Sequence, residues 1–363
     1  MYVITNRHLY KTKTDLAIFG KKPNSEKGPK EIRVVECHKD ADGSWQTNLL
    51  DDTVPPARSK ELAGFLKIPQ QDVVYQSLNV AWQVFQQARA ERRNILLFVH
   101  GYNNDVGDAL ETALTLEQLY GIIPIIYSWP ADGGGIAGTA SYLSDKQDAQ
   151  ISAPAFSRVL EKINTLMLKF TRMGLESLEP QLKRLKTGQT AGSPDYSAER
   201  NRLLEEQCSV RLTLLTHSMG NYVLKKALET HANAGFTNAF DNIVLAAADT
   251  NNLQHEQWVD TIAARRRIYI TINENDYALA ASQLKPGERQ LARLGNYRKR
   301  LNSEIARYID FTDADKVGKS HGYFKDQAVA NPGVKGFFHE AFNGREAEAG
   351  LDYSVAERTF RVR

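Results

Sequence analysis

The feature that most constrains the fold of this chain is an apolar run that turns directly into a helix, Arg211–Lys225. Residues 212–216 are rich in Leu and Thr, which is typical of a buried strand. From residue 221 onward, apolar residues recur at helical spacing. Thr-His-Ser-Met-Gly joins the two parts and puts Ser218 at the apex of a strand-to-helix turn.

Such a turn lifts a serine hydroxyl above the edge of a sheet, which is the placement that a nucleophilic serine needs. The turn also needs small residues on both sides of the serine, because the backbone passes close to itself. Gly220 meets this need, whereas Thr216 is larger than the usual Gly. A serine that only caps a helix is common at the same place. The residues elsewhere in the chain must therefore distinguish a nucleophilic serine from a helix-capping one.

Apolar strands and amphipathic helices alternate along most of the chain. Buried strands are predicted at 95–99, 123–129, 212–216, 243–248, 268–272 and 306–311, and helices at 73–93, 107–119, 145–173, from 221 onward, 255–264 and 332–343. Strands and helices of these lengths in alternation predict an α/β fold with a doubly wound, mostly parallel sheet that helices cover on both faces.

The segments outside this alternation suggest a division of the chain. Residues 1–72 contain short predicted strands at 2–5, 32–36 and 45–49, and we expect a β-rich extension that packs on the main sheet. The main domain is expected over 73–345, and 346–363 as a C-terminal tail. Within the main domain, the polar and partly amphipathic insertion 174–208 is a candidate cap.

Composition narrows the classes of function. The 46 basic and 43 acidic residues leave a net charge of only +3, which does not favour a nucleic-acid partner. Cys37 and Cys208 are far apart, which argues against a disulfide framework or a zinc site. No signal peptide or membrane-spanning run is evident, so a cytoplasmic location is expected, although signal-independent export would leave no trace.

Ligands of parallel sheets bind beyond the carboxyl ends of the strands, so the residues that follow each predicted strand are the candidates for chemistry. Read in chain order, these include His100, Ser218, Asp249, Asp276 and finally His321. Nucleophile, acid and base therefore occur in the order Ser, Asp, His. This is the order of the α/β hydrolases and differs from the two other common serine-hydrolase orders.

Several ordered motifs carry a resemblance over about residues 75–345. They are L-L-F-V-H-G-Y-N-N (96–104), S-W-P-A-D-G (128–133), S-Y-L-S-D (141–145), L-T-H-S-M-G-N (215–221), A-A-D-T (247–250), N-D-Y-A-L (275–279) and S-H-G-Y-F (320–324). With them the chain resembles the α/β-hydrolase superfamily and, within it, the bacterial esterase/lipase-like family known as domain of unknown function nine hundred. The resemblance implies a serine hydrolase but no particular substrate.

Three residues are the candidates for catalysis. Ser218 is expected to be the nucleophile, and His321 the base that activates it and later the acid that protonates the leaving group. Asp276 is expected to orient His321. Asp249 is the alternative acid, because some members of the superfamily take the acid from the end of the preceding strand.

The oxyanion hole is expected to combine the backbone N–H groups of Met219 and Tyr102. Gly101 lets the backbone bend after the predicted strand 95–99, and Asn103 is expected to support the loop that follows this strand. His100 is expected to shape that loop by hydrogen bonding. His217 is expected to point away from the nucleophile and to serve in packing.

The sequence thus predicts a carboxylic-ester hydrolase that needs neither metal nor organic cofactor and acts on a small-molecule or lipid ester. Two alternatives remain: a catalytically inactive binding protein that kept the fold, and an acyltransferase or thioesterase that uses the same residues. The sequence does not predict an oligomeric state.

Overall fold

The computed structural model describes residues 1–66, 73–131, 138–188, 194–207, 210–230, 235, 237–284 and 291–363. The chain forms two compact units. The first unit consists of residues 1–50, 94–161 and 212–363, and the second of residues 51–93 and 162–211. The predicted extension 1–72 is thus divided between the two units.

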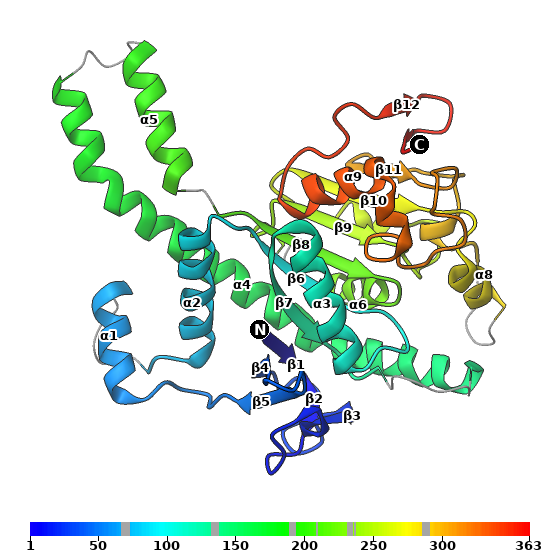
Figure 1. Ribbon diagram of the computed structural model, residues 1–363, viewed down its shortest axis with the longest axis horizontal. Coiled ribbons are helices and arrows are strands. Elements are labelled where there is room, and N and C mark those ends of the chain that lie inside the picture. Colours follow the sequence, from blue (N-terminus) through cyan, green and yellow to red (C-terminus); the bar gives the residue numbers. More distant parts are fainter. Residues whose placement is uncertain are drawn as a thin grey trace. The chain divides into compact units, whose positions relative to one another are not determined.

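One large mixed sheet is the framework of the first unit (Figure 1). Among the described residues, eleven strands lie in the order β12-β13-β11-β10-β9-β8-β6-β7-β1-β4-β5. Their bounds are Tyr2–Thr5 (β1), Arg33–Lys39 (β4), Trp45–Leu49 (β5), Ile95–Val99 (β6), Ile123–Ser128 (β7), Leu212–His217 (β8), Asn242–Ala246 (β9), Arg267–Ile272 (β10), Ala306–Asp310 (β11), Asp352–Ser354 (β12) and Thr359–Arg361 (β13). In this order, the strands from β13 to β1 all pair parallel with their neighbours. At the two edges of the sheet, β12 pairs antiparallel with β13, β4 with β1, and β5 with β4.

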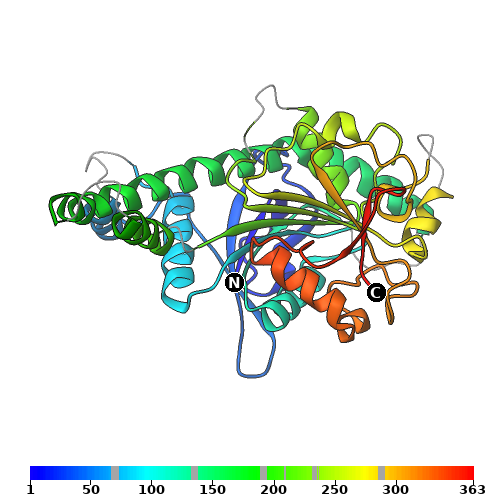
Figure 2. The same cartoon turned by 90° about the horizontal axis from the view of Figure 1, so that it is seen from above.

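Helices cover both faces of this sheet, as Figure 2 shows. Helices α3 (Val106–Tyr120) and α9 (Pro332–Phe342) lie on one face. Helix α6 (Gly220–Glu229) and the first turns of α4 (Gly138–Gly188) lie on the other. All residues of β6 and β8 are buried, which explains the uninterrupted apolar sequence of β6 and the Leu-rich sequence of β8. The prediction of an α/β fold with a mostly parallel sheet is therefore confirmed.

Both ends of the chain contribute to the same sheet. Strand β1 pairs parallel with β7 and antiparallel with β4, so the N-terminal strands continue the main sheet at one edge. Residues 346–363, predicted as a tail, contain β12 and β13 at the opposite edge. Strands β2 (Arg7–Leu9) and β3 (Phe19–Pro23) form a separate two-stranded sheet that the sequence did not predict.

Some predicted bounds were wrong. The helix expected at 255–264 is only the short α7 (Glu256–Val259). The strand expected at 243–248 ends at Ala246, because Ala247 adopts a left-handed backbone with φ of 44° and cannot continue a strand. Both errors lie where turns interrupt an apolar sequence.

Aromatic packing fixes the segment that carries His321. In α9, Phe338 stacks on Phe311 with ring centroids 5.4 Å apart and packs against Tyr323 at 6.0 Å. The α9 N-terminus is capped by the Asn331 side chain, which accepts hydrogen bonds from two backbone N–H groups, and proline occupies the first helical position. The segment between β11 and α9 is therefore held by a packed core.

The second unit is helical. It contains α1 (Pro56–Leu66), α2 (Gln76–Glu91), the later part of α4 and α5 (Pro194–Gln207). Its aromatic side chains cluster, since Phe170 lies 5.6 Å from Trp82 and 5.1 Å from Phe85 between ring centroids. The candidate cap 174–208 belongs to this unit, apart from 189–193 and Cys208, which lie outside the described residues.

Candidate active site

Ser218 stands at a sharp turn between β8 and α6, with a left-handed φ of 53°. This conformation costs a residue with a side chain about 1–2 kcal/mol. Two backbone hydrogen bonds hold it: the Ser218 N–H donates to the oxygen of Ala246 at 3.0 Å, and the Asp249 N–H donates to the oxygen of Ser218 at 3.2 Å. The end of β9 therefore fixes the turn that presents the serine.

Two glycines allow this turn to exist. A Cβ atom at Gly220 would lie 2.8 Å from the carbonyl oxygens of Val99 and His100. A Cβ atom at Gly101 would lie 2.7 Å from the Cβ of Ser218. Neither distance is tolerated, so the end of β6 and the serine turn approach as closely as they do only because both residues lack side chains.

Asn221 completes the turn and explains why Thr216 fits where a glycine was expected. The Thr216 hydroxyl donates to the Asn221 side-chain oxygen at 2.7 Å. The amide nitrogen of Asn221 is within 3.2 Å of the carbonyl oxygens of Thr216, Ser218 and Ala246. Sequence reasoning missed Asn221, because a polar residue in the first turn of a helix usually faces solvent.

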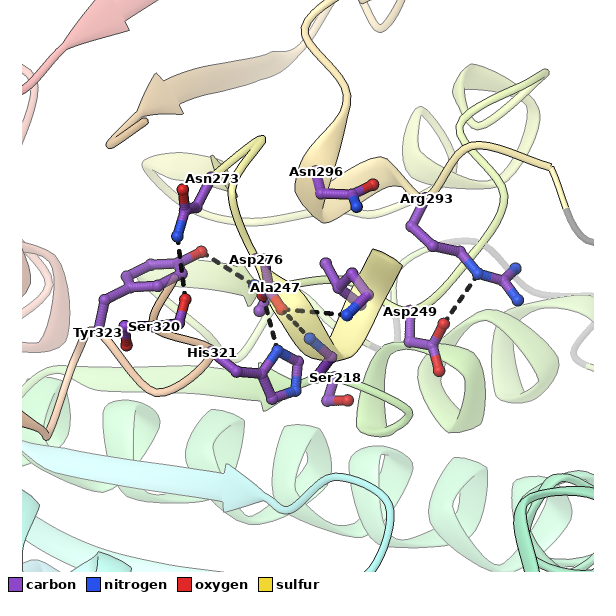
Figure 3. A network of polar contacts seen from close by, with 12 residues as sticks. Ser218, Ala247, Asp249, Asn273, Asp276, Arg293, Asn296, Ser320, His321 and Tyr323 are labelled. Carbon is purple, nitrogen blue, oxygen red and sulfur yellow. Dashed lines mark hydrogen bonds and ion pairs between the residues drawn. The ribbon is translucent and has the colours of Figure 1, made fainter. Parts of the chain in front are cut away.

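The structure brings His321 and Asp276 together with Ser218 (Figure 3). His321 Nδ1 donates to the Asp276 carboxylate at 2.7 Å. Because Nδ1 carries the proton, Nε2 of a neutral His321 ring is free to accept one. Figure 3 shows the Ser218 side chain beside the edge of the ring opposite Asp276.

Asp276 is fully buried and is also the N-cap of α8 (Tyr277–Gln283). One carboxylate oxygen accepts hydrogen bonds from the backbone N–H groups of Ala278 and Leu279, at 2.9 and 3.0 Å. The other oxygen meets His321. The helix N-terminus thereby fixes the orientation of the carboxylate that bonds to His321.

Asp249 is placed differently. Its carboxylate forms a buried ion pair with Arg293 Nε at 3.0 Å and accepts hydrogen bonds from Ser282 and Tyr142 at 2.8 and 3.1 Å. Arg293 in turn reaches Asn251 at 2.7 Å. The alternative acid thus lies near Ser218, but its carboxylate is engaged by Arg293 and two hydroxyl groups.

His100 lies buried under the loop that follows β6. Its Nδ1 donates to the oxygen of Gly101 and its Nε2 meets the Ser128 hydroxyl, both at 3.0 Å. Arg7 donates to that same hydroxyl at 3.1 Å. Burial, with a smaller contribution from Arg7, lowers the pKa of His100 to about 3. His100 is therefore neutral, and it shapes the loop by hydrogen bonding.

The loop that contains Tyr102 is held from α4. Asn103 has a left-handed φ of 58°, and its N–H lies 3.4 Å from an oxygen of Asp145. The Tyr102 ring packs edge-on against Tyr142 at 5.5 Å between centroids. Across the site, no acceptor pairs with the backbone N–H of Met219 among the described residues.

Two further residues position the His321 loop. His217 Nε2 donates to the main-chain oxygen of His321 at 3.0 Å, so His217, which was expected to serve in packing, also holds the His321 backbone. Burial, followed by electrostatic interactions with His321 and Lys325, lowers the pKa of His217 well below its usual value. Asn273 donates to the oxygens of Gly318 and Ser320, both at 3.0 Å.

Among the described residues, no group of three or more His, Cys, Asp or Glu side chains is placed to hold a metal ion. Within the same ranges, no helix is both long and apolar enough to cross a membrane. Cys37 is buried and unbonded to another cysteine.

The chain matches the family described as "Alpha/beta hydrolase of unknown function (DUF900)" over residues 79–169 and 188–339. The protein belongs to this family. These α/β-hydrolase ranges include Ser218, Asp276 and His321, and the resemblance stated from the motifs is confirmed. No curated protein and no solved structure matches the chain.

Proposed function

We propose that this α/β hydrolase is a serine hydrolase that cleaves a carboxylic ester through an acyl-enzyme on Ser218. The observation that carries the proposal is the 2.7 Å hydrogen bond from His321 Nδ1 to the buried Asp276, with Ser218 beside the opposite edge of the ring (Figure 3). A nucleophile, a base and a group that orients the base are the parts that acyl transfer by a serine requires.

In the proposed first half-reaction, His321 Nε2 takes the proton of the Ser218 hydroxyl while Oγ attacks the ester carbonyl. The carbonyl electrons move onto its oxygen, giving a tetrahedral intermediate. As the intermediate collapses, the C–O bond to the alcohol breaks and His321 returns the proton to the leaving oxygen. The second half-reaction repeats these steps with water as nucleophile, releasing the carboxylic acid and free Ser218.

The negative charge of the intermediate needs hydrogen-bond donors. We assign this role to the backbone N–H groups of Met219 and Tyr102. The Met219 N–H supports the assignment, since it has no acceptor among the described residues and directly follows the nucleophile. Gly101 supports it too, because its missing side chain lets the Tyr102 loop approach Ser218 closely.

We assign the acid role to Asp276 rather than Asp249. During the reaction His321 becomes positively charged, and the adjacent buried carboxylate stabilises that charge. Asp249 is already paired with Arg293, so contact with His321 would require breaking a buried ion pair.

A fluorophosphonate probe tests the proposal directly, because it phosphonylates only an activated serine. We expect the wild type to be labelled and Ser218→Ala not to be. Ser320→Ala is the matched control, since Ser320 neighbours His321 but bonds to Asp326. Hydrolysis of p-nitrophenyl esters of rising acyl length then defines the substrate class. Folded wild type that is neither labelled nor active on any ester would overturn the proposal.

A further inference from the structure

Tyr323 lies two residues after His321 and is completely buried. Its hydroxyl is 2.6 Å from the Thr271 hydroxyl on β10 and accepts the backbone N–H of Ala247 at 3.2 Å. One side-chain oxygen thus joins the His321 segment to the ends of two neighbouring strands. Figure 3 shows its contact with Ala247.

Ala247, which bonds to the Tyr323 hydroxyl directly after β9, belongs to the backbone segment that holds the proposed nucleophile. Ala247 has a left-handed φ of 44° without being glycine, a conformation that persists only where the surroundings impose it. The residue before it, Ala246, accepts the Ser218 N–H, and Asp249 N–H donates to the Ser218 oxygen. The Tyr323 hydroxyl therefore reaches the serine turn through one intervening residue.

The Tyr323 ring itself has little freedom to move. It packs against Phe311 at 5.2 Å and Phe338 at 6.0 Å between centroids. Such close packing holds the ring in one position. A fixed ring gives a fixed hydroxyl, so the hydrogen bond to Ala247 sets the distance between two chain segments.

We infer that Tyr323 is a positioning residue that sets the separation between His321 and Ser218. The inference rests on the proposed function, because the separation matters only if the two side chains exchange a proton. Proton transfer and attack require near-contact geometry, and a misplacement of about 1 Å can slow such a step by about a hundredfold. Removal of one oxygen atom at Tyr323 should therefore slow the reaction without altering the substrate contacts.

Tyr308→Phe is the matched control for Tyr323→Phe. Tyr308 is also buried, its hydroxyl accepts the Ser303 N–H at 2.8 Å, and it contacts His255 Nε2 at 2.6 Å. Both substitutions remove one buried hydroxyl with comparable bonds, so both should lower the melting temperature to a similar degree. Only Tyr323 is linked to the Ser218 turn.

With p-nitrophenyl acetate, we expect Tyr323→Phe to lower kcat about tenfold with KM within about twofold of wild type, and to slow fluorophosphonate labelling in proportion. Tyr308→Phe should keep wild-type rates. The proton NMR resonance of His321 Nδ1–H should shift or broaden in Tyr323→Phe alone. If Tyr323→Phe does not fold, Thr271→Val, which removes the partner hydroxyl, should lower kcat in the same direction.

The outcomes distinguish a failure of the proposed function from a failure of the positioning role of Tyr323. A folded wild type that reacts with neither probe overturns the proposed function and this inference together. A reactive wild type with Tyr323→Phe as fast as Tyr308→Phe overturns only the positioning role of Tyr323. An equal loss of kcat in both variants also overturns it, because the effect would then follow from stability.

Discussion

The imidazole of His217 donates a hydrogen bond from Nε2 to the main-chain oxygen of His321, and their ring centroids are 4.6 Å apart. The residue next to the proposed nucleophile thus holds the backbone of the proposed base. Sequence reasoning assigned His217 to packing, on the expectation that the turn points its side chain away from Ser218. The structure adds a specific contact to that packing.

Substitution of His217 should therefore alter activity according to hydrogen bonding. His217→Leu removes the donor and should lower kcat for a p-nitrophenyl ester about tenfold, since the His321 carbonyl is no longer fixed. His217→Gln keeps an N–H donor at a similar reach and should lose less. Steady-state kinetics on both variants checks this, with circular dichroism to establish folding. Equal activity of the Leu and Gln variants would show that the bond has no role.

Two buried histidines should make stability depend on pH. The pKa of His100 is lowered to about 3 and that of His217 well below its usual value, chiefly by burial. Below about pH 6.5 the unfolded chain binds protons that the folded protein does not, so stability falls as pH falls. Each histidine should contribute up to about 1.4 kcal/mol per pH unit. Urea unfolding from pH 7 to 4.5 should show a shallower decline for His217→Gln than for the wild type.

Asp276 and Asp249 should differ in what their loss affects. Asp276→Asn keeps the shape of the side chain but favours the wrong histidine tautomer, and should lower kcat by about 10³-fold or more. Asp249→Asn leaves Arg293 buried without its counter-charge and should destabilise the fold by roughly 3 kcal/mol or more. Esterase assays and urea unfolding of the same two variants measure both effects.

Arg293→Met provides the control for that comparison. Combined with Asp249→Asn, it removes the unpaired charge and should recover part of the lost stability. If Asp249→Asn abolishes activity while remaining folded, and Asp276→Asn stays active, then the acid assignment is wrong.

The two glycines at the serine turn should tolerate no side chain. Gly220→Ala would place Cβ 2.8 Å from two carbonyl oxygens, so we expect loss of fluorophosphonate labelling and destabilisation by about 1–3 kcal/mol. Gly336→Ala in α9 is the control, because, apart from its chain neighbours and the nearby backbone of its own helix, no heavy atom lies within 4 Å of the added Cβ. It should stabilise the protein by up to about 1 kcal/mol, as expected for a helix interior. Normal labelling of Gly220→Ala would contradict the described turn.

The central parallel strands and the residues at their ends could be predicted from the sequence because two-sided burial demands apolar runs. Strand β6 has the predicted bounds Ile95–Val99. By contrast, the pairing of β1 with β7 joins segments far apart in the chain and leaves no local signal. Short edge strands such as β12 are largely exposed and mostly polar, so periodicity does not reveal them.

At the site, residues in the loops that follow the strands were predictable, and residues that support them were not. Asp276 and His321 stand after apolar strands, where the fold concentrates chemistry. Arg293 lies in a polar stretch with several charged residues, and nothing local distinguishes it as buried. The left-handed backbone of Ala247 has no sequence signal either, since alanine normally avoids it.

Strand β1 pairs with both β7 and β4, and this has a consequence for folding during translation. As the chain leaves the ribosome, β1 can pair with β4 early, but its other edge waits for β7, and such long-range pairings form slowly. Ser218 likewise emerges well before His321. Under the proposed function, a nascent chain would therefore carry an unactivated serine, and its reactivity would arise only when the later strands complete the sheet.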